Sequence, residues 1–202
     1  MANGKVCIGF SMPWVALYAN NNGTVTYSGG IPLARGVEVD MSVEGADDNN
    51  FWADNVLAES DRRAFSSGTI TLTVDGLKSA ARKLISGVTN TRTSGSSGSS
   101  VTWDVYDDDA VIPFVGVGFV VKYMEEGVIT YAPFIATKVK FAEPSVTAST
   151  ETDTIEFQTT SLEGTLYRDD SAKHGWKLVP QTDFSTEEEA VTAYKQILTA
   201  AG

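Results

Sequence analysis

Apolar and polar residues alternate over several short stretches of the chain, which is the pattern of half-buried β-strands. The clearest alternation spans residues 37–44. It predicts a strand with one face in the core and one acidic face toward water or a channel. The core face is expected to hold Val37, Val39, Met41 and Val43, and the other face Glu38, Asp40, Ser42 and Glu44.

The remaining pattern also consists mainly of strands. The first apolar run is predicted to end at Met12-Pro13, and tight turns are predicted at Asn20–Gly23 and Glu125–Gly127. Together with the abundance of Val and Thr, this pattern predicts a β-dominated α+β fold. Further strands are expected at residues 6–10, 14–18, 25–27, 69–74, 101–105, 114–124, 128–141 and 162–166, with Ile155 and Phe157 in one more.

Two segments have helical spacing instead. The first is expected to run from an N-cap at Asp75 to Ser86, with Gly87 as its C-cap. Its expected apolar stripe consists of Leu77, Ala80, Ala81, Leu84 and Ile85. The second is expected over residues 185–200, where Ser185 and Glu188 have the spacing of a capping box. Its expected apolar face consists of Ala190, Val191, Tyr194, Ile197 and Leu198.

Residues 40–68 form an unusually long connection between two predicted strands. Its middle carries aromatic and apolar residues among polar ones, so we expect a projection that either folds back on the body or docks into a partner. The residues assigned to it are Asp47, Asp48, Asn49, Asn50, Phe51, Trp52, Asp54 and Leu57. A second connection, residues 93–100, is almost entirely Ser and Gly and is predicted to be a flexible loop.

Composition narrows the functional classes. The 202 residues suit a single domain, residues 1–202, and the net charge of −11 argues against tight binding of free nucleic acid. The longest apolar stretch, residues 111–121, is too short to span a membrane as a helix. With one cysteine, one histidine and no predicted signal peptide, we expect a soluble protein of a reducing cytoplasm without a metal or cofactor.

No group of residues predicts catalysis. Gly116-Val117-Gly118 lies within a predicted strand rather than before a helix, and Asp107–Asp109 lacks the pattern of a calcium loop. His174 with Ser171 and Asp170 is interpreted as a surface turn, and Cys7 as a small core residue. We therefore expect no enzyme activity.

Three stretches of the chain form an ordered set. The first is Phe51-Trp52-Ala53-Asp54-Asn55 followed by residues 68–72. The second is residues 128–133 through 138–141 with Glu143-Pro144, and the third is residues 154–159 with Leu162-Glu163-Gly164, the Trp176 loop and the final helix. Taken together, this set resembles the major tail proteins of long-tailed, non-contractile bacteriophages. The resemblance covers nearly the whole chain and depends on the ordered set rather than on one motif.

This resemblance implies a tail-tube β-sandwich or barrel with a flanking helix, a C-terminal helix and a long inter-strand loop. In that family six copies form a ring, rings stack into a tube that conducts DNA, and the long loop reaches the neighbouring ring. The implied partners are further copies of the chain and the tape-measure, tail-terminator and distal tail proteins, in a virion tail assembled in the host cytoplasm. Membrane insertion is not implied.

Two alternatives remain open. The first is the tube protein of a contractile tail or a secretion system. The second is a monomeric carbohydrate-binding β-sandwich with Trp52 and Trp176 as stacking platforms. For Glu38, Asp40 and Glu44, two interpretations carry equal weight: they line a negatively charged lumen that lets DNA slide, or they only solubilise an outer face.

Overall fold

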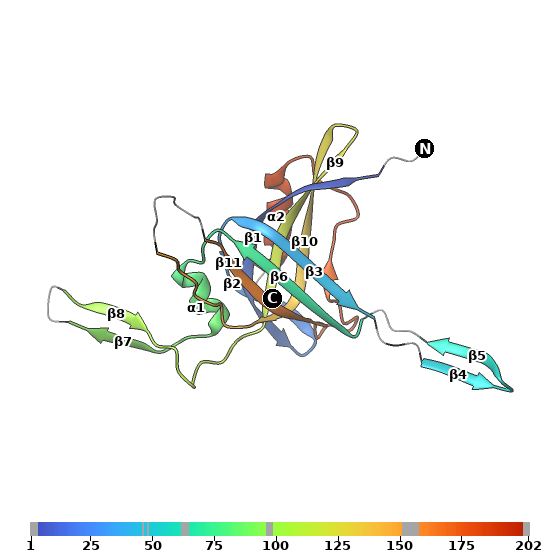
Figure 1. The fold of residues 1–202 in the computed structure, drawn as a ribbon, viewed down its shortest axis with the longest axis horizontal. Helices are drawn as coiled ribbons and strands as arrows, with labels where there is room; N and C mark the ends of the chain where they lie inside the picture. Colours follow the sequence, from blue (N-terminus) through green and yellow to red (C-terminus); the bar gives the residue numbers. More distant parts are fainter. Residues whose placement is uncertain are drawn as a thin grey trace.

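The computed structural model of the chain describes residues 4–45, 47, 49–61, 65–95, 99–150 and 158–199. It is a β-dominated α+β structure with one large sheet, two small hairpins and two helices (Figure 1). The strands are β1 (Val6–Asn21), β2 (Thr24–Pro32), β3 (Gly36–Glu44), β4 (Asn49–Ala53), β5 (Val56–Asp61), β6 (Ser67–Val74), β7 (Thr91–Ser94), β8 (Val101–Asp104), β9 (Val115–Glu125), β10 (Val128–Phe141), β11 (Thr160–Tyr167) and β12 (Lys177–Leu178). The helices are α1 (Ser79–Ser86) and α2 (Glu187–Leu198).

The large sheet has the strand order β2-β1-β9-β10-β11-β6-β3, and β12 adds to β10. Every pairing in it is antiparallel. The β3 end curls back toward β1: Gly36 lies against the ring of Phe10, and the Leu33 amide donates to the Pro13 carbonyl at 3.0 Å. This curl encloses the main core, into which α1 inserts Ala81 and Ile85.

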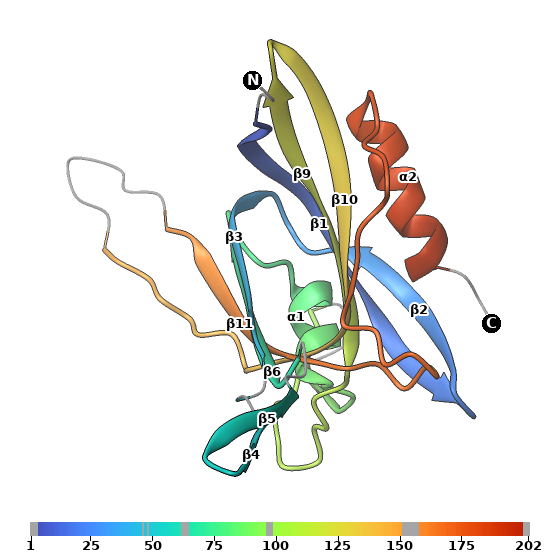
Figure 2. The same cartoon turned by 90° about the vertical axis from the view of Figure 1, so that its right-hand side faces the viewer.

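A second core lies on the other side of the sheet. There α2 covers β9 and β10 on the side away from β3, β6 and β11 (Figure 2). The buried side chains of α2 include Ala190, Val191, Tyr194 and Leu198, whereas Ile197, which we assigned to the apolar face, is exposed.

The first strand differs from its prediction. Instead of ending at Met12-Pro13, β1 continues through a bulge, where its register against β9 shifts between Ser11 and Trp14. Met12 adopts a φ of 54°, and its carbonyl accepts a hydrogen bond from the Tyr194 hydroxyl at 2.9 Å. Because the β-bulge accommodates the residues that cannot pair regularly with β9, Pro13 does not end the strand.

The two predicted tight turns are confirmed. Asn22 and Gly23 join β1 to β2, and Glu126 and Gly127 join β9 to β10, all four with positive φ. Positive φ at both central residues is the geometry that matches the twist of a two-residue hairpin.

Helix α1 begins later than predicted. Its N-cap is Lys78 rather than Asp75, and Ala80 is exposed. Asp75 instead accepts hydrogen bonds from the backbone amide of Arg35 at 3.0 Å and from its Nε at 2.5 Å, and this guanidinium lowers the pKa of the carboxyl. The predicted C-cap is confirmed, because Gly87 has a φ of 68° and donates to the Lys83 carbonyl.

Helix α2 is offset by one residue from its predicted capping box. Thr186 is the N-cap and Glu189 the N3 residue, while Ser185 donates to the same Glu189 carboxylate at 3.0 Å. The helix spans residues 187–198 rather than 185–200. Among the described residues, no helix is both long and apolar enough to cross a membrane.

The alternation predicted for residues 37–44 is largely confirmed. Val39, Met41 and Val43 pack against the core, and Glu38, Asp40 and Glu44 are exposed. Val37 is exposed instead of buried, because the register of β3 against β6 shifts between Gly36 and Glu38. The predicted strand at residues 162–166 is β11, whereas Ile155 and Phe157 lie outside the described residues.

Candidate functional site

The long connection contains a separate hairpin, β4–β5, that extends from one end of the molecule (Figure 1). Its turn is Asp54-Asn55, with φ values of 50° and 62°. The two strands pair only with each other among the described strands. The structure thus shows a projection rather than a segment folded back on the body.

The apolar side chains of this hairpin are exposed to solvent. Phe51 is 63% exposed and Trp52 61%, and Leu57 is also exposed. Phe51 stands opposite Glu59, and Trp52 opposite Leu57. The register between the two strands shifts between these two pairs, and both aromatic rings remain exposed.

The other residues assigned to this projection are partly described. Asp47, Asn50 and Asp54 are exposed, and Asn49 pairs with Asp61 in the β4–β5 register. Asp48 lies outside the described residues.

A polar, acidic surface covers the outer face of β3, β6 and β11. In register across these strands, Asp40 stands beside Thr71, and Thr71 beside Glu163. The same face contains Glu38, Ser42, Glu44, Ser67, Thr69, Thr73, Ser161 and Thr165, and no basic residue. Glu163 was missed from the sequence, because Thr71, its neighbour in this surface, lies 92 residues earlier in the chain.

The acidic face ends at β10, which contributes Lys138 and Lys140. Lys138 binds Asp170 at 2.7 Å, and Lys140 lies over the ring of Phe114. Asp170 also accepts a hydrogen bond from Tyr18 at 2.8 Å. Lys138 and Tyr18 lower the pKa of the Asp170 carboxyl, while burial raises the pKa of Tyr18 to about 12.

A second projecting hairpin, β7–β8, was not predicted. It contains Thr93 and Ser94, which we had assigned to the flexible Ser/Gly loop; residues 96–98 of that loop lie outside the described residues. Trp103 is 58% exposed, and its Nε1 donates to the Ser94 hydroxyl at 2.9 Å. The alternation of Val101 and Trp103 did predict a strand at this position. Its partner strand was not predicted, because it includes the beginning of the Ser/Gly run, which shows no alternation.

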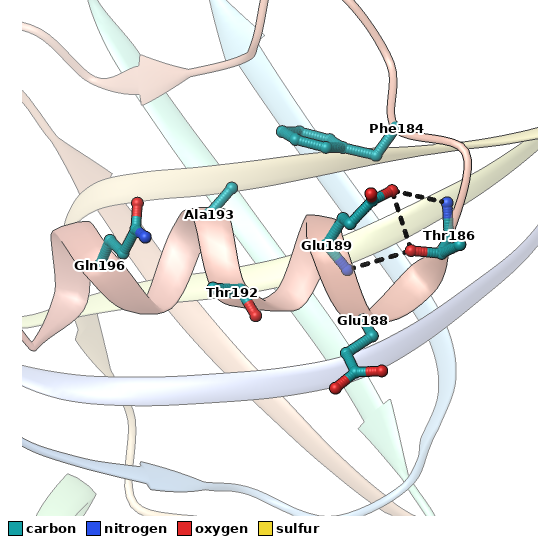
Figure 3. A pocket seen from close by; sticks show the side chains of 7 residues that line it. All are labelled: Phe184, Thr186, Glu188, Glu189, Thr192, Ala193 and Gln196. Carbon is teal, nitrogen blue, oxygen red and sulfur yellow. Dashed lines mark hydrogen bonds between the residues drawn. The ribbon is translucent and has the colours of Figure 1, made fainter.

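The pocket at the start of α2 is a helix cap rather than an open binding site. Figure 3 shows the Glu189 carboxylate turned toward Thr186, whose backbone N and Oγ1 lie 3.2 and 2.9 Å from it. These hydrogen bonds lower the pKa of Glu189. The polar atoms on this side of the pocket are therefore already paired with each other.

The other residues with possible chemistry occupy structural positions. Ser171 donates to Asp169 at 2.5 Å, and the His174 amide donates to the Ser171 carbonyl, which closes a local turn. Cys7 is exposed on β1 rather than buried in the core, so its interpretation as a core residue was wrong. Among the described residues, no group of three or more His, Cys, Asp or Glu side chains is placed to hold a metal ion.

Trp176, considered above as an exposed stacking platform, is only partly exposed. Its ring lies 5.1 Å from that of Phe65, and it packs against the main core. Of the two tryptophans considered as stacking platforms, Trp52 is the exposed one.

The chain was also compared with known proteins. Neither the family models nor the curated proteins give a match.

Proposed function

We propose that this chain is a structural virion protein, the tail-tube subunit of a long-tailed, non-contractile bacteriophage. Copies would form homohexameric rings, and the rings would stack into a tube through which DNA is ejected. The proposal assigns the chain no catalytic role and no cofactor. It extends the sequence resemblance described above to an assembly mechanism.

The observation that carries this proposal is the β4–β5 hairpin. Phe51 and Trp52 are large apolar side chains held away from the body with most of their surface in water. Large apolar side chains left in water are candidates for burial in an interface, and a lone two-stranded hairpin is only marginally stable in water. We propose that this hairpin is the arm that contacts the neighbouring ring.

Two further features support a tube subunit. β2 and β3 end the order of the large sheet, and edge strands offer unpaired backbone groups to a neighbouring chain. The acidic face of β3, β6 and β11 would repel phosphate, so DNA could pass without binding to it. On this proposal Glu38, Asp40, Glu44 and Glu163 face the lumen.

A carbohydrate-binding module and a tube subunit differ in their state in solution. Size-exclusion chromatography with light scattering, over a hundredfold range of concentration, distinguishes the two. A tube subunit is expected to shift toward rings and larger polymers as concentration rises. A species that stays at 21.6 kDa throughout would contradict the proposal.

A further inference from the structure

The two projecting hairpins lie at opposite ends of the molecule's longest axis (Figure 1). They cannot meet within one subunit, but copies aligned head to tail bring β7–β8 of one copy toward β4–β5 of the next. A contact between two different surfaces repeats without closing when the copies are translated along an axis. Such a contact suits a stack of subunits.

The β7–β8 hairpin has one apolar, cationic face. Arg92 stands opposite Trp103, and Ser94 opposite Val101, so these four side chains share a face. The other face holds Thr91, Thr93, Thr102 and Asp104. Trp103 is 58% exposed and Val101 51%. Because the indole N–H already donates a hydrogen bond to the Ser94 hydroxyl, the rest of the ring presents an apolar surface to a partner.

Arg92 is the unpaired charge of that hairpin. Asp104 is neutralised by Lys83, whose Nζ lies 2.6 Å from its carboxylate. The Arg92 side chain has no hydrogen bond or ion pair with another described residue, and it is exposed. A guanidinium can form an ion pair with a carboxylate of a partner, and the exposed tryptophan beside it can pack on an aromatic ring of the same partner.

The β4–β5 hairpin presents the complementary pair. Phe51 stands opposite Glu59, so an aromatic ring and a carboxylate share one face. Residues 49–61 contain Asp54, Glu59 and Asp61 and no Lys or Arg. The Glu59 side chain is exposed and has no hydrogen bond or ion pair with another described residue.

We propose that the Arg92/Trp103 face of one copy binds the Phe51/Glu59 face of the next copy. Arg92 pairs with Glu59 while Trp103 packs on Phe51. This inference rests on the proposed tube function and names the receptor of its stacking arm. Each single contact is small, but its repetition around a ring strengthens the binding between two rings by avidity.

The first test is a charge exchange. Glu59→Arg and Arg92→Glu, each alone, place like charges together and should raise the concentration needed for assembly about tenfold at low salt. The double variant restores opposite charges and should assemble nearly as the wild type does. Asp108→Arg and Lys173→Glu make the same charge changes at exposed positions outside both hairpins and should leave assembly unchanged.

The second test does not depend on polymer formation. In a Cys7→Ser background, Glu59→Cys and Arg92→Cys subunits carrying different tags are mixed at high concentration and mildly oxidised. A disulfide-linked heterodimer from the mixture, well above the homodimer from either variant alone, is expected. The cross-link tests the contact even if wild-type protein forms no tube.

The outcomes separate the two proposals. If wild-type protein assembles while the charge exchange and the cross-link have no effect, the hairpin contact is overturned and the tube function stands. If the cross-link forms but no rings or polymers appear, the contact stands and the tube function is overturned. Single variants that weaken assembly without rescue in the double variant would show that the hairpins bind something other than each other.

Discussion

Two glycines in β9 let helix α2 lie directly on the sheet. A Cβ atom added at Gly118 would lie 2.7 Å from Leu198 and 2.8 Å from Tyr194, and one at Gly116 would lie 2.3 Å from the ring of Tyr27. From the sequence, these glycines were considered only as an incomplete dinucleotide loop. The structure gives them a packing role instead.

Gly118→Ala should therefore weaken the packing of α2. Extra volume in a tightly packed core costs about 1–3 kcal/mol, so we expect the free energy of unfolding in urea to fall by that amount. Gly9→Ala is the matched control in the same sheet, because its Cβ would meet only Lys122, at an ordinary 3.7 Å. Equal stability of the two variants would contradict this account of the α2 contact.

Buried tyrosines make the fold sensitive to high pH. Burial raises the pKa of Tyr27 and Tyr194 far above the usual value near 10, and their hydroxyls donate to the carbonyls of Thr137 and Met12. Above pH 10 the unfolded chain loses these protons while the folded chain keeps them. Stability is therefore full below pH 10 and is lost as the pH rises, by about 1.4 kcal/mol per pH unit for each such tyrosine.

Tyr27→Phe removes one of these groups. We expect a lower free energy of unfolding at pH 8, because the hydrogen bond to Thr137 is lost, but a shallower decline between pH 10 and 11.5. Tyr167→Phe, at an exposed position, is the control and should keep the wild-type slope. Urea unfolding at four pH values measures both slopes, and identical slopes for all three proteins would refute the assignment to Tyr27.

At the scale of elements, β4–β5 should be dispensable for folding. Replacing residues 48–59 with a short Gly-Ser turn leaves β3 and β6 intact, because these strands pair with each other along residues 36–44 and 67–74. We expect thermal melting of the subunit to change little while assembly fails, since buried aromatic anchors often contribute about 2 kcal/mol or more each.

Phe51→Ser is the milder companion of this replacement. It removes one exposed ring and keeps the Asp54-Asn55 turn, so it should reduce assembly without altering the melting temperature. An unfolded subunit in either variant would show that the hairpin supports the body. Normal polymers in both would refute its stacking role.

The elements recovered from the sequence are those whose signals are local. The alternation in β6, the two-residue turns and the C-cap at Gly87 depend on neighbouring residues, and all were predicted correctly. The errors arose where distant residues decide. Asp75 binds Arg35 instead of capping α1, a bulge carries β1 past Pro13, and the partner strand of β8 lies across a Ser/Gly run that shows no alternation.

For the candidate surfaces too, features with a local sequence signal were anticipated and features that depend on distant residues were not. Apolar residues among polar ones in a long connection left two possibilities for Phe51 and Trp52, packing on the body or exposure to a partner, and the structure shows exposure. The β7–β8 hairpin and the place of Glu163 in the acidic face were not predicted, because both depend on strand register. The strand register decides which residues lie side by side across two strands. Between strands far apart in the sequence, this register cannot be derived from the sequence alone.

At the scale of the whole molecule, the subunit has a curled sheet, a helix on its outer face and apolar hairpins at both ends. On the proposed function, a stacked assembly would bury both hairpins at every level. The acidic face and the free sheet edges would then have defined places, one toward the lumen and the other toward neighbours in the ring. Each of these assignments depends on self-assembly.

Negative-stain electron microscopy of the purified protein tests self-assembly most directly. The account predicts rings with sixfold symmetry and hollow tubes made of stacked rings, more abundant at higher concentration and without a sheath. A field of single, uniformly small particles at high protein concentration, from a chain shown to be folded, would contradict it.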